Sequence, residues 1–392
     1  MVQNKTFLIC VLQHRNSSYA ITACLHLFKA LSSAQDLKSQ CKIVIAASSR
    51  SDNELLKLIS IFGDTFDIDI FECNPSYPEK MKAVLNAYPQ EQYTYFIKHD
   101  EDLFLSEDSW IRLLRNSPQE LNDTKNLLTT VNLSTGIPSW NSFVRSFFPL
   151  SLQRNITDHL IHDDIPSHVW GNDYSKVNEK IRKMKVWNEN LYWEAVNKLS
   201  YDYKGIHPVR TNIWYTKTIN EYCIEHYDSL FESTSNKSFT RCSNRYFCNS
   251  FFLIPYATYK TIFEDTTLYC DAFDEVPINA YKKRRGLSFS FLDDSCGIHI
   301  LYNSVYNQTA TYNKKNYNGA DLEEQFSYAY FKKITHILAR VDKRIHDLHF
   351  IKTPFIKRLK NNIKLTKTYG SLYLYAFNSP SLRKVYRRCF KK

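Results

Sequence analysis

An acidic triplet directly after an apolar segment has the clearest chemical meaning in this sequence. Residues 93–98 have the aromatic and β-branched composition of a buried strand, and Asp100, Glu101 and Asp102 follow it. Carboxylates one residue apart can both reach a hard divalent cation, which prefers oxygen ligands and bridges diphosphate oxygens. A solvated acidic turn is an equally good interpretation of the triplet alone, because D-x-D is short and frequent.

Two later positions could join this chemistry. Asp274 and Glu275 precede Pro277, which the first turn of a helix tolerates. Carboxylates there interact favourably with the helix dipole, so helix capping explains the pair by itself. His299 lies in an apolar segment, where a single histidine is more often structural than a ligand. Neither position identifies a site on its own.

The elements that must position these residues alternate in type along the first third of the chain. The predicted strands are residues 5–12, 41–47, 66–71, 93–98 and 127–133, and the predicted helices are residues 18–31, 55–62, 78–87 and 107–115. We expect Ser51 to begin a capping box and Ser106 to cap the last helix. This alternation predicts an α/β fold with a mainly parallel sheet flanked by helices, whose ligand site lies at the carboxyl ends of the strands.

The middle of the chain has a different composition. Residues 137–245 are irregular in pattern and rich in tryptophan and tyrosine, which predicts an inserted region of helices and loops. Its aromatic rings form either a buried core, the favoured interpretation, or a groove in which sugars pack on the rings. Regular patterns return at residues 251–254, 256–263, 275–285 and 298–302.

Composition excludes several classes of protein. The 392 residues allow two domains, or one large domain with an appendage. With 43% hydrophobic and 23% charged residues, the chain is not disordered, collagenous or a coiled coil. The 10 cysteines include no C-x-x-C pair and are interpreted as reduced core thiols. No segment has the apolar length of a secretory signal or a membrane span, so we expect a soluble or peripheral protein of a reducing compartment.

The net charge of +11 is concentrated at one end. Residues 331–392 contain 17 Lys and Arg and two acidic residues, whereas the other residues contain 34 basic and 38 acidic ones. Residues 353–363 combine an apolar stripe with flanking basic residues, as in helices that lie on anionic membranes. A helix docked on the rest of the chain is the alternative. We expect an anionic membrane surface as partner of the tail, and no nucleic acid.

Taken together, the three motifs resemble the inverting glycosyltransferases of the GT-A fold, particularly family 2. In that family a D-x-D closes a strand of the nucleotide-binding half, and an apolar segment, an acidic loop ending in an E-D pair, a helix and a glycine follow. Residues 249–263 correspond to the apolar segment, and residues 274–286 match the spacing from the acidic pair to Gly286. His299 falls where some members place a metal-binding histidine. The resemblance covers residues 5–135 and 245–305.

The resemblance implies a metal-dependent transferase that moves a sugar from a nucleotide-diphosphate donor to a glycan or glycolipid acceptor. Asp102 and His299 would bind Mn²⁺ or Mg²⁺, and Asp100 would reach the ribose or the metal. Glu275 would be the general base by register, with Asp274 as the alternative, because the pair here is Asp-Glu rather than Glu-Asp. Arg15 and Asp52 would contact the nucleotide. Family members often recognise the nucleotide base through an Asp at the end of the second strand. Of that pattern, residues 46–52 contain only the final Ser-Asp, so the identity of the nucleotide is not determined.

The predicted organisation follows from these assignments. Residues 1–135 form the nucleotide-sugar-binding half, 136–245 the insertion or acceptor region, 246–330 the acceptor and catalytic half, and 331–392 the basic tail. We expect synthesis of a surface polysaccharide, such as lipopolysaccharide or capsule, at the cytoplasmic face of the inner membrane. The rivals are a non-catalytic adaptor that binds membrane or nucleic acid through its tail, and a metal-dependent nuclease.

Overall fold

The computed structural model describes most of the first 300 residues. The described ranges are 5–13, 17–73, 76–135, 140–162, 164–165, 173–199, 208–210, 213–248, 250–268 and 275–300, with Lys333, His336, Ile337, Ala339, Arg344 and Ile345. The chain divides into two compact units, residues 1–319 and 320–392. Only those six isolated residues of the second unit are described, so the predicted amphipathic helix and the rest of the predicted basic tail lie outside the described residues.

The first unit is built on one mixed sheet of nine strands, in the order β3-β2-β1-β4-β8-β6-β9-β5, with β7 paired to β9 off this path. The strands are β1 (Lys5–Leu12), β2 (Cys41–Ala47), β3 (Ile68–Glu72), β4 (Tyr93–Asp100), β5 (Leu103–Leu105), β6 (Asn126–Leu133), β7 (Phe239–Cys242), β8 (Phe251–Pro255) and β9 (Ser288–His299). Strands β1 to β4, β6 and β9 run in one direction, and β8, β5 and β7 run against their neighbours.

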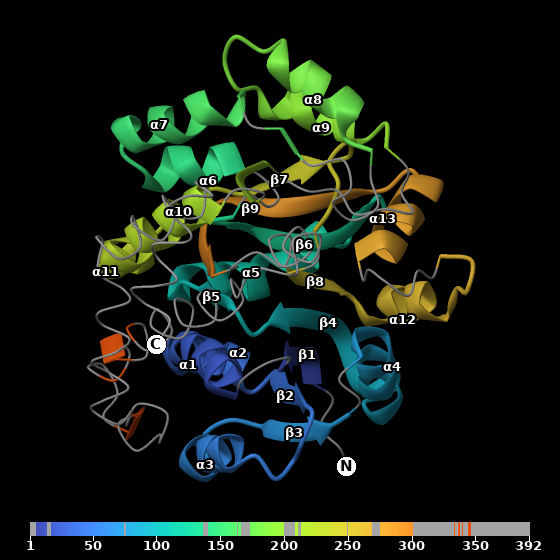
Figure 1. The fold of residues 1–392 in the computed structure, drawn as a ribbon. Coiled ribbons are helices and arrows are strands. Elements are labelled where there is room, and N and C mark those ends of the chain that lie inside the picture. The colour runs from blue at the N-terminus through green and yellow to red at the C-terminus, as the bar shows by residue number, and fades with distance from the viewer. Residues whose placement is uncertain are drawn as a thin grey trace, which may run out of the picture. The chain divides into compact units, whose positions relative to one another are not determined.

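Helices cover both faces of this sheet (Figure 1). They are α1 (Ser17–Ser33), α2 (Gln35–Lys38), α3 (Asn53–Phe62), α4 (Tyr77–Ala87), α5 (Glu107–Glu120), α6 (Trp140–Phe147), α7 (Leu150–Leu160), α8 (Ser175–Arg182), α9 (Glu189–Val196), α10 (Ile213–Glu225), α11 (Tyr227–Glu232), α12 (Tyr256–Glu264) and α13 (Glu275–Arg284), with 3-10 turns at Gln90–Gln92 and Pro208–Arg210. The predicted fold class, a mainly parallel sheet flanked by helices, is confirmed.

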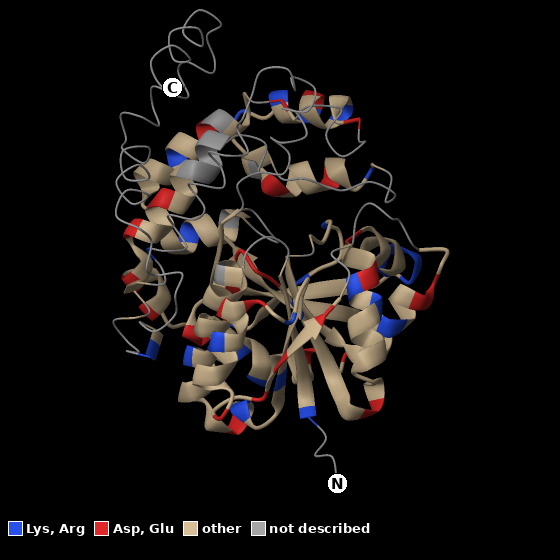
Figure 2. Ribbon diagram, turned by 60° about the horizontal axis from the view of Figure 1, so that its bottom comes forward, with Lys and Arg blue, Asp and Glu red and all other residues tan. Residues whose placement is uncertain are grey.

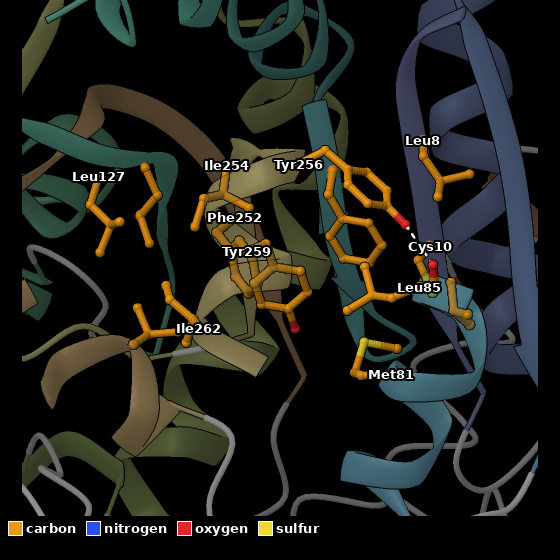
Figure 3. Close-up of a cluster of buried hydrophobic side chains, with 14 of the residues drawn as sticks. Leu8, Cys10, Met81, Leu85, Leu127, Phe252, Ile254, Tyr256, Tyr259 and Ile262 are labelled. Atoms are coloured by element: carbon orange, nitrogen blue, oxygen red, sulfur yellow. Dashed lines mark hydrogen bonds between the residues drawn. The ribbon is translucent and has the colours of Figure 1, made fainter. Parts of the chain in front are cut away.

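One large apolar cluster lies between the sheet and helices α4, α12 and α13 (Figure 3). Alternate residues of β1, Leu8, Cys10 and Leu12, face it. The intervening residues of β1 are equally buried on the opposite face, where α1 packs. A strand that is covered on both faces has a continuously apolar sequence. Because such a sequence is easy to delimit, the observed bounds of β1 and β2 equal the predicted ones. Figure 2 shows that charged positions are sparse on the strands and frequent on the helices.

The N-cap of helix α3 lies one residue later than predicted. Its N-cap is Asp52, whose carboxylate accepts hydrogen bonds from the backbone N–H groups of Glu54 (2.9 Å) and Leu55 (3.1 Å). The predicted capping box starting at Ser51 is therefore wrong, because the Asp52 carboxylate satisfies the helix N-terminus instead. The predicted cap of α5 is confirmed, since the Ser106 hydroxyl accepts from the Ser109 N–H at 3.2 Å.

Strand β9 is longer than predicted and irregular. Its register against β6 shifts between Leu292 and Gly297, so the residues between them form a bulge. The Ser295 hydroxyl in this bulge accepts from the Asn132 N–H at 2.8 Å and so replaces a ladder hydrogen bond. The bulge contains Asp293, Asp294 and Ser295, which have the composition of a turn. This composition explains why the sequence predicted only the last residues of β9, within the segment 298–302. The short strands β5 and β7 were not predicted either.

The inserted region is helical, as predicted, and three of its tryptophans are buried. Trp140 and Trp193 are at most 1% exposed, and Trp187 is also buried. The carboxylate of Glu189 on α9 accepts from the N–H of Trp140, the first residue of α6, at 2.9 Å. The favoured interpretation of these rings as a buried core is confirmed for Trp140, Trp187 and Trp193.

Cysteine chemistry also agrees with the prediction. The eight described cysteines are free thiols, and all of them except Cys73 are buried. Burial raises the pKa of the Cys41 thiol to about 12, so it stays protonated at neutral pH. Within the described ranges, no helix has the length and apolar character needed to cross a membrane.

Candidate functional site

The carboxyl ends of three adjacent parallel strands meet at one edge of the sheet. Leu12, the last residue of β1, pairs with Ala46 of β2 on one side and with Asp100 of β4 on the other. The backbone N–H of Asp100 donates to the carbonyl of Ser250, which immediately precedes β8, at 3.0 Å. Asp100 therefore lies at the edge where open α/β sheets bind ligands, as the sequence predicts.

The acidic triplet forms a tight turn between β4 and β5. Asp100 and Asp102 are partly exposed, with 22% and 23% of their side-chain surfaces accessible, whereas Glu101 is buried. Strand β5 pairs with the end of β9, and the N–H of Ile300 donates to the carbonyl of Asp102 at 2.9 Å. The end of β9 is thereby held against the triplet.

His299, the last residue of β9, lies next to Asp102. Its Nε2 is 3.4 Å from an Asp102 carboxylate oxygen, and its Nδ1 is 2.9 Å from the Thr135 hydroxyl. Its backbone N–H donates to the Ser134 hydroxyl at 3.0 Å. Because Thr135 engages one ring nitrogen, the imidazole is held with the other nitrogen towards the carboxylate. The structure thus brings together two residues that are predicted to act at one site.

These two side chains suit a divalent cation with few protein ligands. Among the residues that the structure describes, no group of three or more His, Cys, Asp or Glu is arranged to hold a metal ion. A carboxylate oxygen and an imidazole nitrogen are both accepted by Mn²⁺, and diphosphate oxygens and water can complete its coordination. The Asp102–His299 pair can therefore supply two ligands to such a cation.

Two buried lysines lie beneath the same edge, and the sequence analysis did not single them out. The Lys98 side chain on β4 is 2% exposed, and its ammonium is 2.7 Å from an Asp100 carboxylate oxygen. Lys80 on α4 is fully buried and donates to the carbonyls of Gln13 (2.7 Å) and Ala46 (3.3 Å). Burial lowers the pKa of Lys80. A charged residue inside a segment predicted to be a buried strand was the available signal for Lys98.

His99 points to the opposite face of the sheet from its neighbours. Its ring stacks on Trp110 at a centroid distance of 5.5 Å and meets Phe251 edge-on at 5.4 Å. Burial lowers its pKa to about 3, so the ring is neutral at physiological pH. His99 therefore packs in the core, and the chemistry of the edge is left to the residues on either side of it.

Glu275, the predicted base, is the first residue of α13 and is 1% exposed. Its carbonyl accepts from the Asn279 amide at 2.8 Å, and the same amide group exchanges two hydrogen bonds with the backbone of Phe247, at 2.8 and 2.7 Å. Phe247 leads into β8, whose first residue, Phe251, pairs with His99 of β4. The start of α13 is thereby tied to the strand edge that carries the acidic triplet. Asp274 lies outside the described residues.

The two predicted nucleotide contacts remain predictions. Arg15 lies outside the described residues. Asp52 caps α3 through one carboxylate oxygen, and its other oxygen accepts from the hydroxyl of Ser17, the first residue of α1, at 2.8 Å. Asp52 therefore ties together the starts of two helices behind β1 and β2, which is a structural role that sequence reasoning missed.

Comparison with known proteins adds structural likeness at low identity. No protein-family model and no curated protein matches the chain. The chain is similar to the crystal structure of S. aureus TarS 1–349, with 9% identity, a TM-score of 0.33, and coverage of 94% of this chain and 74% of that one. It is also similar to the crystal structure of GalNAc-T7 with UDP, GalNAc and Mn²⁺, with 10% identity, a TM-score of 0.40 and 93% coverage, but it spans only 59% of that chain. At these values neither likeness defines an activity.

Proposed function

We propose that this chain is a metal-dependent glycosyltransferase that uses a nucleotide-diphosphate sugar. The observation that carries the proposal is the contact between Asp102 and His299 at the carboxyl edge of the sheet. The two residues are far apart in sequence, yet His299 Nε2 lies 3.4 Å from a carboxylate oxygen of Asp102. This contact is at the edge where α/β sheets bind ligands. A solvated acidic turn would not require a buried, oriented imidazole beside it.

In this proposal the charges of the turn act on the leaving group. Asp102 and His299 would hold Mn²⁺ or Mg²⁺, which supplies electrostatic stabilisation of the departing diphosphate. Thr135 keeps the imidazole oriented towards Asp102. Asp100, fixed by Lys98, accepts hydrogen bonds from the nucleoside, and Arg15 and Asp52 contribute to nucleotide binding.

The second half of the reaction needs a base. Glu275, or Asp274 if the register differs by one residue, accepts the proton of the acceptor hydroxyl as that oxygen attacks the anomeric carbon. Direct displacement by one nucleophile inverts the configuration at that carbon. The position of Glu275 supports this role, because Asn279 and Phe247 tie the start of α13 to the strand edge that carries the acidic triplet.

The most direct test is substitution of Asp102. Wild type should be stabilised by UDP, GDP, CMP or dTDP only with Mn²⁺, by about 2.7 kcal/mol at a ligand concentration of 100 Kd. Asp102→Ala should lose this stabilisation and the Mn²⁺-dependent hydrolysis of the nucleotide sugar, while it stays folded. Asp228→Ala, which removes an exposed carboxylate on α11, serves as the matched control.

Two results would contradict the proposal. Full Mn²⁺-dependent activity in Asp102→Ala would make the carboxylate structural. Degradation of DNA or RNA with Mg²⁺, in place of hydrolysis of a nucleotide sugar, would favour a nuclease.

We further propose a glycan or glycolipid acceptor of a surface polysaccharide, such as lipopolysaccharide or capsule, and a peripheral position at the cytoplasmic face of the inner membrane. The support is the charge of residues 331–392, with 17 basic and two acidic residues. Polybasic segments gain about 1 kcal/mol per basic residue near an anionic surface.

Truncation tests the tail. Removal of the chain after residue 340 should abolish co-sedimentation with anionic vesicles and preserve activity on a soluble acceptor. Salt should weaken vesicle binding by the full chain, because screening shortens the reach of the charges. Equal sedimentation of both forms would exclude the tether, and an inactive truncated form would favour a tail that packs on the catalytic unit.

A further inference from the structure

The buried Lys98 distinguishes the two aspartates of the acidic turn. Its ammonium is 2.7 Å from a carboxylate oxygen of Asp100, whereas the carboxylate of Asp102 faces the imidazole of His299. Lys98 therefore offsets one of the negative charges of the turn.

The ammonium of Lys98 is held between an aromatic ring and a carboxylate. Its ammonium lies 5.3 Å from the centroid of the Tyr77 ring, a cation–π arrangement. The Tyr77 hydroxyl is 3.1 Å from the hydroxyl of Tyr259 on α12, so two helices hold the aromatic support in place. A buried ammonium is costly unless it is paired, and Asp100 supplies a pair whose outer side is still accessible. The pair therefore fixes the direction in which the carboxylate of Asp100 points.

We propose that Lys98 is a positioning residue: it orients Asp100 for the donor nucleotide and offsets one negative charge, so that the turn binds a single cation through Asp102 and His299. This inference rests on the proposed function and assigns unequal roles to the two aspartates. Lys98 acts on the nucleotide through Asp100, and it acts on the cation through its own charge.

The two effects have opposite signs in Lys98→Met. Loss of a positive charge near the turn should tighten Mn²⁺ binding without nucleotide by roughly three- to tenfold, because like-charge repulsion is removed. Loss of the orientation of Asp100 should weaken Mn²⁺-dependent nucleotide binding by about tenfold and raise KM for the donor more than it lowers kcat. Lys98→Arg, which keeps the charge, should restore most of the nucleotide affinity. A merely structural lysine would weaken both binding events together.

A double-mutant cycle shows whether Lys98 acts through Asp100. If it does, Lys98→Met should weaken nucleotide binding little further in the Asp100→Asn background. Lys42→Met is the matched control. Lys42 is also a strand lysine paired with an aspartate, since its ammonium is 2.6 Å from a carboxylate oxygen of Asp67. It lies at the start of β2, whereas the candidate site lies at the carboxyl ends of the strands. That control should change neither affinity.

The measurements are electron paramagnetic resonance titration with Mn²⁺ alone and calorimetric titration with whichever of UDP, GDP, CMP or dTDP stabilises wild type. Additive losses in the cycle, or unchanged or weakened Mn²⁺ binding in folded Lys98→Met, would overturn the inference and leave the proposed function intact. If wild type bound none of these nucleotides with Mn²⁺, the proposed function would fail, and the role of Lys98 with it.

Discussion

The two halves of the sheet differ in regularity, and the candidate site lies where they meet. Strands β1 to β4 lie in parallel with a continuous register, whereas β9 is bulged and has antiparallel neighbours in β5 and β7. The regular half ends in the acidic triplet, and the irregular half delivers His299 to it. The regular half thus supplies the carboxylates at the carboxyl edge of its strands. The bulged half supplies the imidazole of His299, which lies beside Asp102.

The largest expected effect is at the start of α13. Glu275→Gln should lower turnover by about 10²- to 10⁴-fold with donor binding retained, because the amide keeps the shape of the side chain but cannot accept a proton. Steady-state kinetics and nucleotide titration measure the two quantities separately. If Asp274→Asn is inactive and Glu275→Gln is active, the base is Asp274 and the register of the pair shifts by one residue.

A smaller effect is expected from the support that the β6 end gives to His299. Thr135→Val removes the hydroxyl at Nδ1 and should weaken Mn²⁺ affinity by about 10- to 100-fold, because partners of metal-binding histidines orient the ring. Thr130→Val is the matched control, since the buried hydroxyl of Thr130 on β6 donates to the carbonyl of Phe251 instead. Equal Mn²⁺ affinities in wild type and both variants would show that His299 does not bind the cation.

The smallest effect concerns the contact between the regular half and the insertion. His26 on α1 is buried, with its Nε2 2.7 Å from the hydroxyl of Tyr227 on α11, and burial lowers its pKa from 6.5 to about 4. The unfolded chain therefore binds a proton that the folded chain excludes between these values. This group's contribution to stability is complete above pH 6.5 and is lost as the pH falls towards 4, at a cost on the order of 1–2 kcal/mol at pH 5.

Urea unfolding at pH 7.5 and pH 5 measures this loss. His26→Gln should show a flatter pH dependence than wild type, and the exposed His226→Gln should behave like wild type. An unchanged slope in His26→Gln would show that other groups carry the acid sensitivity.

Much of the regular half could be predicted, because its information is local. Strands β1 and β2 have the predicted bounds, since both of their faces are covered and their sequences are continuously apolar. The end of β4 could also be placed, because three acids follow an apolar segment. The bulged half could not be predicted in the same way, since Asp293, Asp294 and Ser295 have the composition of a turn and form a bulge between two segments of β9 that pair with β6.

The sequence by itself determined the residue types that could meet at the site, namely a D-x-D after a strand, an acidic pair before a helix and a histidine at the end of an apolar segment. Only the tertiary structure decided which of them touch. Gly297 shows the reason, because a side chain there would come within 2.6 Å of Leu133 and 2.8 Å of the Asn132 carbonyl. The close approach of β6 and β9 that places His299 beside Asp102, and the pairing of Lys98 with Asp100, depend on contacts that no local pattern encodes.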